Sequence, residues 1–157
     1  MAAGTDMTTL GIKFAYGIES TAGTKPTKFT QLPRCRKVAG ISLSQEKIDL
    51  SCLEDFIAKY GAGRQDTGGD WSATFLTGAI ADVKSMMTAS AAAATGLRTW
   101  YEVYVPGLSD AFFVVAEPGT KIPLPDISDN SALEFDVSLT IEEYIGMEAA
   151  VEPEAAA

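Results

Sequence analysis

Residues 133–142 read Leu-Glu-Phe-Asp-Val-Ser-Leu-Thr-Ile-Glu, an unbroken alternation of apolar and polar side chains. Successive side chains of a β-strand point to opposite faces, so this stretch predicts a strand with one buried face. The other face is polar and carries Glu134, Asp136 and Glu142. The stretch therefore indicates a sheet with one buried side and one solvated, acidic side.

The segments that precede this strand predict further β-structure. Residues 99–105 are rich in aromatic and β-branched side chains, residues 106–110 are typical of a turn, and residues 111–117 are apolar again. This pattern predicts a β-hairpin. Residues 71–77 predict another strand, with its aromatic side chains on one face.

One helix is expected between these strands, beginning near Thr77-Gly78 and ending before Gly96. Asp82 lies in its first turns, where the helix dipole favours a negative charge. The apolar stripe follows a spacing of i, i+3 and i+7 and comprises Ile80, Val83 and Met87.

The N-terminal third is interrupted by turn residues. Residues 11–19 predict a short strand and residues 20–26 a loop. Residues 36–50 predict one long strand, with a bulge or bend near Gln45 where the alternation changes phase. Residues 51–69 fit either one or two helical turns or an irregular arm, and connections of this length are often functional.

These elements predict an α+β, mainly β fold: a β-sandwich or open barrel with one flanking α-helix and a long extended arm. A single domain is expected over residues 1–147, with an N-terminal arm at about 1–10 and the longer arm at about 51–69. Residues 148–157 are acidic and alanine-rich, and we expect them to form a flexible tail.

Composition excludes several classes of function. The chain has 157 residues, no histidine and a net charge of −9, which argues against histidine-based catalysis and against general nucleic-acid binding. Residues 1–40 carry a net charge of +4 and residues 41–157 a net charge of −13. Two isolated cysteines, Cys35 and Cys52, are expected to stay reduced. Neither a metal-ligand pattern nor a phosphate-binding loop is present, so we predict a non-enzymatic protein without a cofactor that does not span a membrane.

Several segments together resemble a known family. They are residues 9–16, which lead into Glu19-Ser-Thr-Ala-Gly-Thr-Lys-Pro26, then Gln31-Leu-Pro33 with the long strand after it, and then Leu53-Glu-Asp55 with the arm up to Gly69. The order of strand, helix, Trp-containing hairpin and long alternating strand matches as well. Over residues 8–146 the chain resembles the major tail tube proteins of long non-contractile-tailed, siphovirus-type bacteriophages.

The resemblance implies a structural subunit of the virion tail that is assembled in the bacterial host cytoplasm. Members of that family form six-fold rings, which stack into a hollow tube that first holds a tape-measure protein and later conducts DNA. The implied partners are other copies of the chain, the tape-measure protein and the tail-tip and terminator proteins. A related tail-terminator or secretion-type tube protein stays open as an alternative, as does a monomeric β-sandwich binding module.

Two groups of residues are candidates for contacts in such an assembly. Glu134, Asp136 and Glu142 are expected to face the lumen, where negative charge would repel DNA; an outward, solvated face is the alternative. Contacts between rings or subunits are expected from the arm and the basic segment, that is from Leu53, Glu54, Asp55, Phe56, Ile57, Tyr60, Arg64, Lys25, Arg34, Arg36 and Lys37. For the apolar arm residues the alternative is packing against their own domain.

Overall fold

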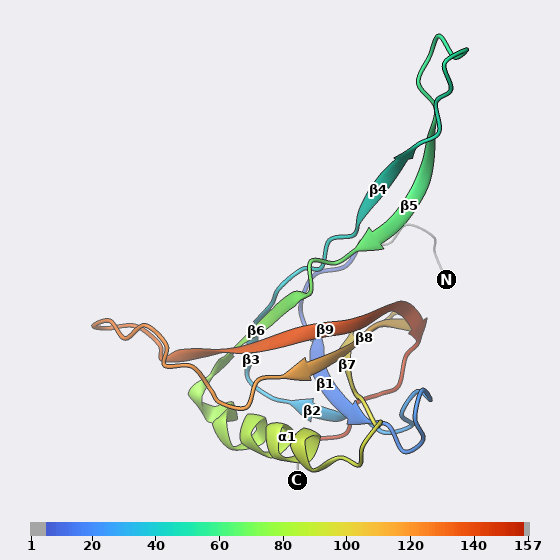
Figure 1. Ribbon diagram of the computed structural model, residues 1–157. Helices are drawn as coiled ribbons and strands as arrows, with labels where there is room; N and C mark the ends of the chain where they lie inside the picture. The colour runs from blue at the N-terminus through green and yellow to red at the C-terminus, as the bar shows by residue number, and fades with distance from the viewer. Residues whose placement is uncertain (1–5, 156–157) are drawn as a thin grey trace.

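The structure, a computed structural model, describes residues 6–155 and is built on one antiparallel sheet (Figure 1). The sheet has seven strands in the order β2-β1-β7-β8-β9-β6-β3. Their bounds are β1 Lys13–Ile18, β2 Thr30–Leu32, β3 Cys35–Val38, β6 Asp70–Leu76, β7 Thr99–Tyr104, β8 Asp110–Pro118 and β9 Glu134–Ala149. A separate two-stranded sheet pairs β4 (Ser44–Asp49) with β5 (Tyr60–Asp66).

The seven-stranded sheet is curled into an open barrel around its main core. Phe14 of β1 lies 5.5 Å from Trp71 and 5.9 Å from Phe75 of β6, measured between ring centroids. Since β1 and β6 are four strands apart in the sheet, a flat sheet would hold them about 19 Å from each other. The predicted mainly β fold with one flanking helix is therefore confirmed, and its β part is an open barrel.

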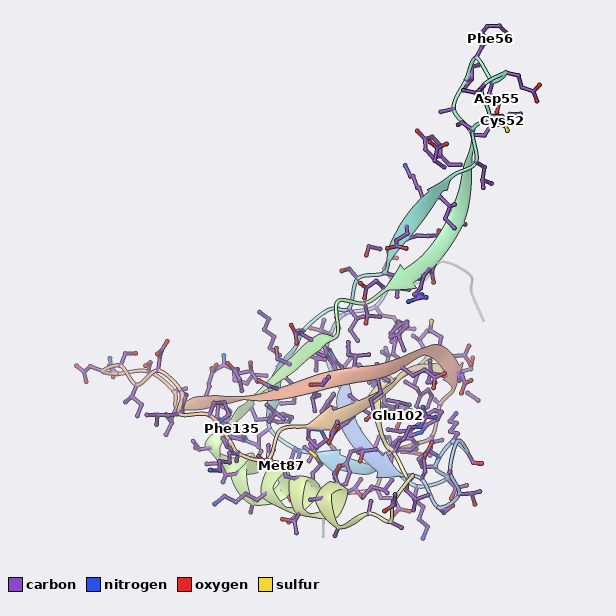
Figure 2. All side chains as sticks on the ribbon, viewed as in Figure 1. Cys52, Asp55, Phe56, Met87, Glu102 and Phe135 are labelled. Carbon is purple, nitrogen blue, oxygen red and sulfur yellow. The ribbon has the colours of Figure 1, made fainter. Side chains whose placement is uncertain are left out.

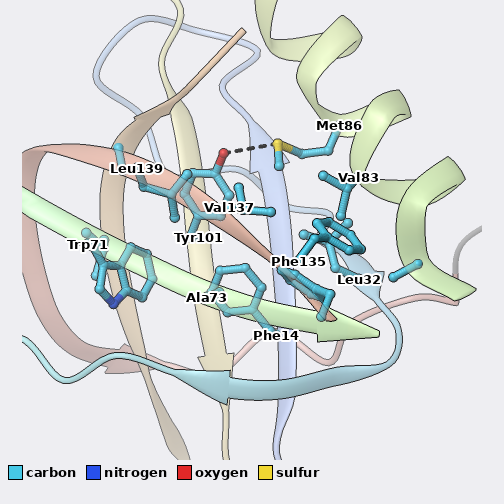
Figure 3. Packing of buried hydrophobic residues seen from close by; sticks show 14 residues of the cluster. Phe14, Leu32, Trp71, Ala73, Val83, Met86, Tyr101, Phe135, Val137 and Leu139 are labelled. Carbon is cyan, nitrogen blue, oxygen red and sulfur yellow. Dashed lines mark hydrogen bonds between the residues drawn. The ribbon is translucent and has the colours of Figure 1, made fainter. Parts of the chain in front are cut away.

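The helix covers one end of this core (Figure 3). A 3₁₀ turn, η1 (Thr77–Ala79), leads into α1 (Ile80–Ala92). Val83 and Met86 are fully buried, and the Met86 sulfur accepts a hydrogen bond of 3.2 Å from the Tyr101 hydroxyl. Met86, rather than the expected Met87, is thus the innermost methionine.

The helical segment begins at the expected Thr77, as the 3₁₀ turn, and ends earlier than expected. No side chain caps the N-terminus, and α1 ends at Ala92, four residues before the expected glycine. Gly96 instead lies in the turn that leads to β7, with φ at +90°.

A second, smaller cluster lies on the opposite face of the sheet and contains Phe29, Trp100 and Phe113. The C-terminal residues cover part of it. The Glu154 N–H donates to the Phe29 carbonyl at 2.8 Å, and the Gln31 N–H donates to the Glu154 carbonyl at 2.7 Å. Residues 150–155 therefore lie against the domain where a flexible tail was expected, because their backbone groups find partners beside β2. Residues 156–157 and the first half of the expected N-terminal arm, residues 1–5, lie outside the described residues.

The prediction of one long strand over residues 36–50 is wrong. Residues 39–43 interrupt it, so that β3 pairs with β6 in the main sheet and β4 pairs with β5 in the hairpin. The predicted bulge is nevertheless present in β4, where the register shifts between Gln45 and Lys47. The arm therefore begins near residue 44 rather than 51. Residues 51–59 are irregular, one of the two expected alternatives, and the residues after them form strand β5.

A buried carboxylate fixes the loop after β1. Glu19 accepts hydrogen bonds from the Trp100 indole N–H at 2.8 Å, the Arg98 backbone N–H at 2.9 Å, the Arg98 guanidinium at 3.3 Å and the Gly23 N–H at 3.3 Å. Burial raises the pKa of Glu19, but these donors outweigh burial and lower it below the ordinary value of 4.5.

We therefore predict that Glu19→Gln lowers the free energy of unfolding by about 1–3 kcal/mol at neutral pH. A lowered pKa in the folded state means that the carboxylate stabilises the fold above pH 4.5, and that this contribution is lost as the pH falls further. Urea unfolding of both proteins at pH 7 and at pH 3 measures this. A difference that does not shrink at pH 3 would contradict the role of the charge.

Candidate assembly surfaces

The most unusual surface of the molecule is the hairpin of β4 and β5, residues 44–66, called the arm below. It projects away from the barrel (Figure 1). Every residue of β4 is exposed, and so are most residues of β5. An isolated two-stranded hairpin is marginally stable in water. This geometry is therefore typical of a segment that contacts another molecule.

Residues 50–59 form the tip of the arm, and local hydrogen bonds shape it. The Cys52 N–H donates to the Asp55 carboxylate at 2.8 Å, which lowers the pKa of Asp55. The Lys59 ammonium group forms an ion pair with Asp55 at 3.1 Å. The backbone N–H of Lys59 donates to the Ser51 hydroxyl at 2.8 Å. The tip is thus an ordered turn, so a partner would not have to order it on binding.

The tip displays apolar side chains to solvent. Leu53 and Phe56 are fully exposed, and Phe56 lies at the far end of the arm (Figure 2). Ile57 is 80% exposed, and Tyr60, the first residue of β5 beside the tip, is 62% exposed. The alternative in which these four residues pack against their own domain is therefore wrong. Exposed apolar groups clustered at one end of a projecting segment are typical of an interaction site.

The basic residues expected to act together are separated in the structure. Lys25 donates to the Ala149 carbonyl at 2.6 Å and lies 4.0 Å from the centroid of the Phe113 ring, so its ammonium group holds β9 and the second cluster. Arg34 occupies the turn between β2 and β3 with φ at +61°. Arg36 and Lys37 follow it on β3, at an edge of the main sheet.

The acidic residues of β9 occupy exposed or partly exposed positions of its alternating stretch, which runs to a bulge at Glu142. Asp136 accepts a hydrogen bond of 2.6 Å from the Thr74 hydroxyl, and Glu134 forms an ion pair of 2.6 Å with Arg36. Glu142 is the extra residue of a bulge between Ile141 and Glu143. The strict alternation therefore ends at this bulge, which the period-two pattern did not reveal.

The structure also contains a groove that sequence reasoning missed. It has a volume of about 600 Å³ and lies at the base of the arm. Its lining includes Val38, Ala39 and Ile41, which precede the arm, and Phe14 and Trp71 of the barrel. These residues come from distant parts of the chain. Only the apolar spacing of residues 38–41 gave a local signal, and it could equally indicate a continuous strand.

Neither metal nor membrane features accompany these surfaces. Within residues 6–155, no group of three or more acidic or cysteine side chains could hold a metal ion. In the same range, no helix has the length and hydropathy needed to cross a membrane.

Phe56 offers a direct check on the exposure of the tip. Phe56→Ser should change the free energy of unfolding by less than about 0.5 kcal/mol, because the ring contacts only solvent. The buried Phe75 is the matched control, and Phe75→Ala should cost about 3–5 kcal/mol. Urea unfolding of dilute protein measures both. A loss above about 1 kcal/mol for Phe56→Ser would mean that the ring packs against its own domain.

Comparisons with known proteins give similarity in structure only. No protein-family model matches the sequence, and no curated protein matches it either. Among solved structures, the chain is similar to one in the anti-feeding prophage cap, described as the tube terminating cap, with a TM-score of 0.60 and 11% identity. The alignment covers 96% of this chain and 95% of that one.

Two further structures have the same overall similarity. The sheath/tube terminator of an extracellular contractile injection system, PVC, in its extended state matches with a TM-score of 0.58 and 13% identity, over 94% of this chain and 100% of that one. A chain of the anti-feeding prophage baseplate matches with a TM-score of 0.51 and 10% identity, over 92% and 95% of the two chains. The chain therefore shares its fold over nearly its whole length with components of contractile injection systems.

Proposed function

We propose that the chain is a structural subunit of a tail tube, and that it assembles with other copies of itself into stacked rings. The observation that carries the proposal is the arm, whose ordered tip presents fully exposed Leu53 and Phe56 away from the barrel. An apolar surface of this kind is stabilised only when a partner removes it from water. The likeness in fold to tube-associated structures supports this assignment.

The edges of the sheet also favour association. β3 is an outer strand of the barrel and presents backbone groups on one side that the sheet does not pair, whereas the outer side of β2 is partly paired with Glu154. Unpaired edges are templates for pairing with another chain, and a closed ring of subunits would remove them. Six-fold symmetry, a tape-measure partner and passage of DNA are part of the proposal through the resemblance to tail tube proteins. So are a place in the virion tail, assembly in the host cytoplasm and a non-enzymatic role.

We also propose that Glu134, Asp136 and Glu142 face the lumen of the tube. Their carboxylates would then repel DNA phosphates and prevent the DNA from adhering to the wall. A cryo-EM reconstruction of the assembled protein tests this proposal, and carboxylates on the outside of the tube would contradict it.

A tube-terminator role is the second candidate. The observation that favours it is that two of the similar structures are a tube cap and a tube terminator, with TM-scores of 0.60 and 0.58. A tube subunit should elongate into long hollow tubes, whereas a terminator should stop at a single closed ring.

Negative-stain electron microscopy of concentrated protein at moderate salt distinguishes these possibilities. We expect hollow tubes or stacked rings. Rings of a single layer, with no elongation, would favour the terminator. Monomers alone at every concentration, with or without a tail-tip complex as initiator, would contradict both and favour a monomeric binding module.

Replacement of residues 44–66 by a short Gly-Ser linker tests the part played by the arm. These residues contribute no side chain to either buried cluster, so the barrel should keep its thermal unfolding midpoint within a few degrees. The variant should stay soluble and fail to elongate in the same electron microscopy assay. Tubes of normal length from the armless protein would show that the arm is not needed.

A further inference from the structure

The groove at the base of the arm is an apolar recess with a basic rim. Its walls and floor are mainly side chains of the barrel and of residues 38–41, and its volume of about 600 Å³ is within the ~300–1,000 Å³ range of sites that accept a compact group. Arg36 and Lys37 line the same groove. Both are exposed. Arg36 is paired with Glu134, whereas Lys37 has no ion pair among the described residues, so its charge is available at the mouth of the groove.

The tip of the arm has the complementary properties. Leu53 and Phe56 are fully exposed, and Glu54 and Asp55 lie between them in the sequence. Asp55 is paired with Lys59, whereas Glu54 has no ion pair among the described residues. Two apolar side chains and the carboxylate of Glu54 therefore face solvent at one end of the arm, and an apolar recess with a basic rim lies at the other.

The two surfaces cannot meet within one chain. The groove is lined by residues 39–41, where the arm leaves the barrel, and the paired strands β4 and β5 carry the tip away from that point (Figure 1). From residue 41 to residue 53 an extended strand spans about 40 Å. A contact between tip and groove must therefore join two copies, head to tail, and such heterologous contacts can repeat along an assembly.

We propose that the arm tip of one copy docks into the groove of a second copy. Phe56 and Leu53 occupy the apolar recess, and Glu54 faces Lys37 at its rim. This inference rests on the proposed function in requiring that copies associate, and it names the surface that receives the arm.

The two cysteines of the chain lie on the two sides of this contact. Cys52 is exposed in the tip, and Cys35 is half-buried in the lining of the groove. A short bis-maleimide added to concentrated protein should therefore link Cys52 of one copy to Cys35 of another. Mixing isotopically labelled and unlabelled protein identifies links between copies by mass spectrometry. Burial raises the pKa of the Cys35 thiol, so the reaction is run at about pH 8.

A second variant provides an accessible thiol at the groove in case Cys35 does not react with the maleimide. Gly40 also lines the groove, and a Cβ at this position would meet no atom within 4 Å. Cys35→Ser with Gly40→Cys therefore places an accessible thiol at the mouth of the groove, and it should link to Cys52 between copies.

Substitutions at the tip test the apolar part of the contact. Phe56→Asp should reduce the yield of this link at least about tenfold, as expected for the loss of a central apolar anchor. Leu124→Asp is the matched control, because Leu124 is an apolar side chain that is 86% exposed on a loop far from the tip in sequence, and it should leave the yield unchanged.

A charge exchange tests the rim. Glu54→Lys and Lys37→Glu should each lower the yield of the link, and the protein that carries both should recover it. Recovery is specific to a direct contact, because an indirect effect on folding would add in the double variant.

The outcomes separate this inference from the proposed function. Links from Cys52 to residues 35 or 40 of another copy, with the effects above, support the docking. Oligomers by light scattering without these links in either cysteine arrangement, or links only between two Cys52 residues, overturn the docking and leave self-assembly intact. Monomers without any link at high concentration overturn both.

Discussion

The contact of Phe14 with Trp71 and Phe75 determines the form of the molecule. It brings the first and sixth strands across the barrel, so the sheet must curl around one core. The helix then covers one end through Val83 and Met86. At the base of the arm the core is closed only in part, and the groove forms there. The arm cannot contribute to this core, because its strands leave the barrel altogether (Figure 1).

Two buried carboxylates hold the segments that wrap the sheet, and they do so in different states. Glu19 is fully supplied with donors, which lower its pKa. Burial raises the pKa of Glu102. The Val151 N–H donates to one of its oxygens at 2.9 Å, and the other oxygen has no hydrogen-bond partner among residues 6–155. Glu19 fixes the loop after β1, and Glu102 holds the C-terminal segment at Val151, so β7 anchors both segments.

A basic part and an acidic part of the sequence lie on different surfaces of the molecule. The basic residues near the N-terminus include Arg36 and Lys37 at the groove, whereas the acidic remainder includes Glu54 and Asp55 at the tip. Opposite charges on separate surfaces of one chain favour association in a single orientation, head to tail. The ion pair of Arg36 with Glu134 joins two residues that were expected to belong to different surfaces, one between subunits and one in the lumen.

The sequence by itself determined the elements whose signal is local. Alternation over residues 133–142, the hairpin at 99–117 and the helix with Val83 in its stripe follow from spacing along the chain, and so does the mainly β class. Tertiary structure alone decided that β3 and β4 belong to different sheets, that residues 150–155 pack beside β2, and that a groove lies below the arm. The reason is physical: periodicity reports which face of an element is apolar, whereas strand partners and cavities depend on contacts between residues far apart in the chain. For the same reason, the sequence shows that Phe56 is apolar but not that it is exposed. Its exposure follows from the tertiary structure, in which the core forms from other residues.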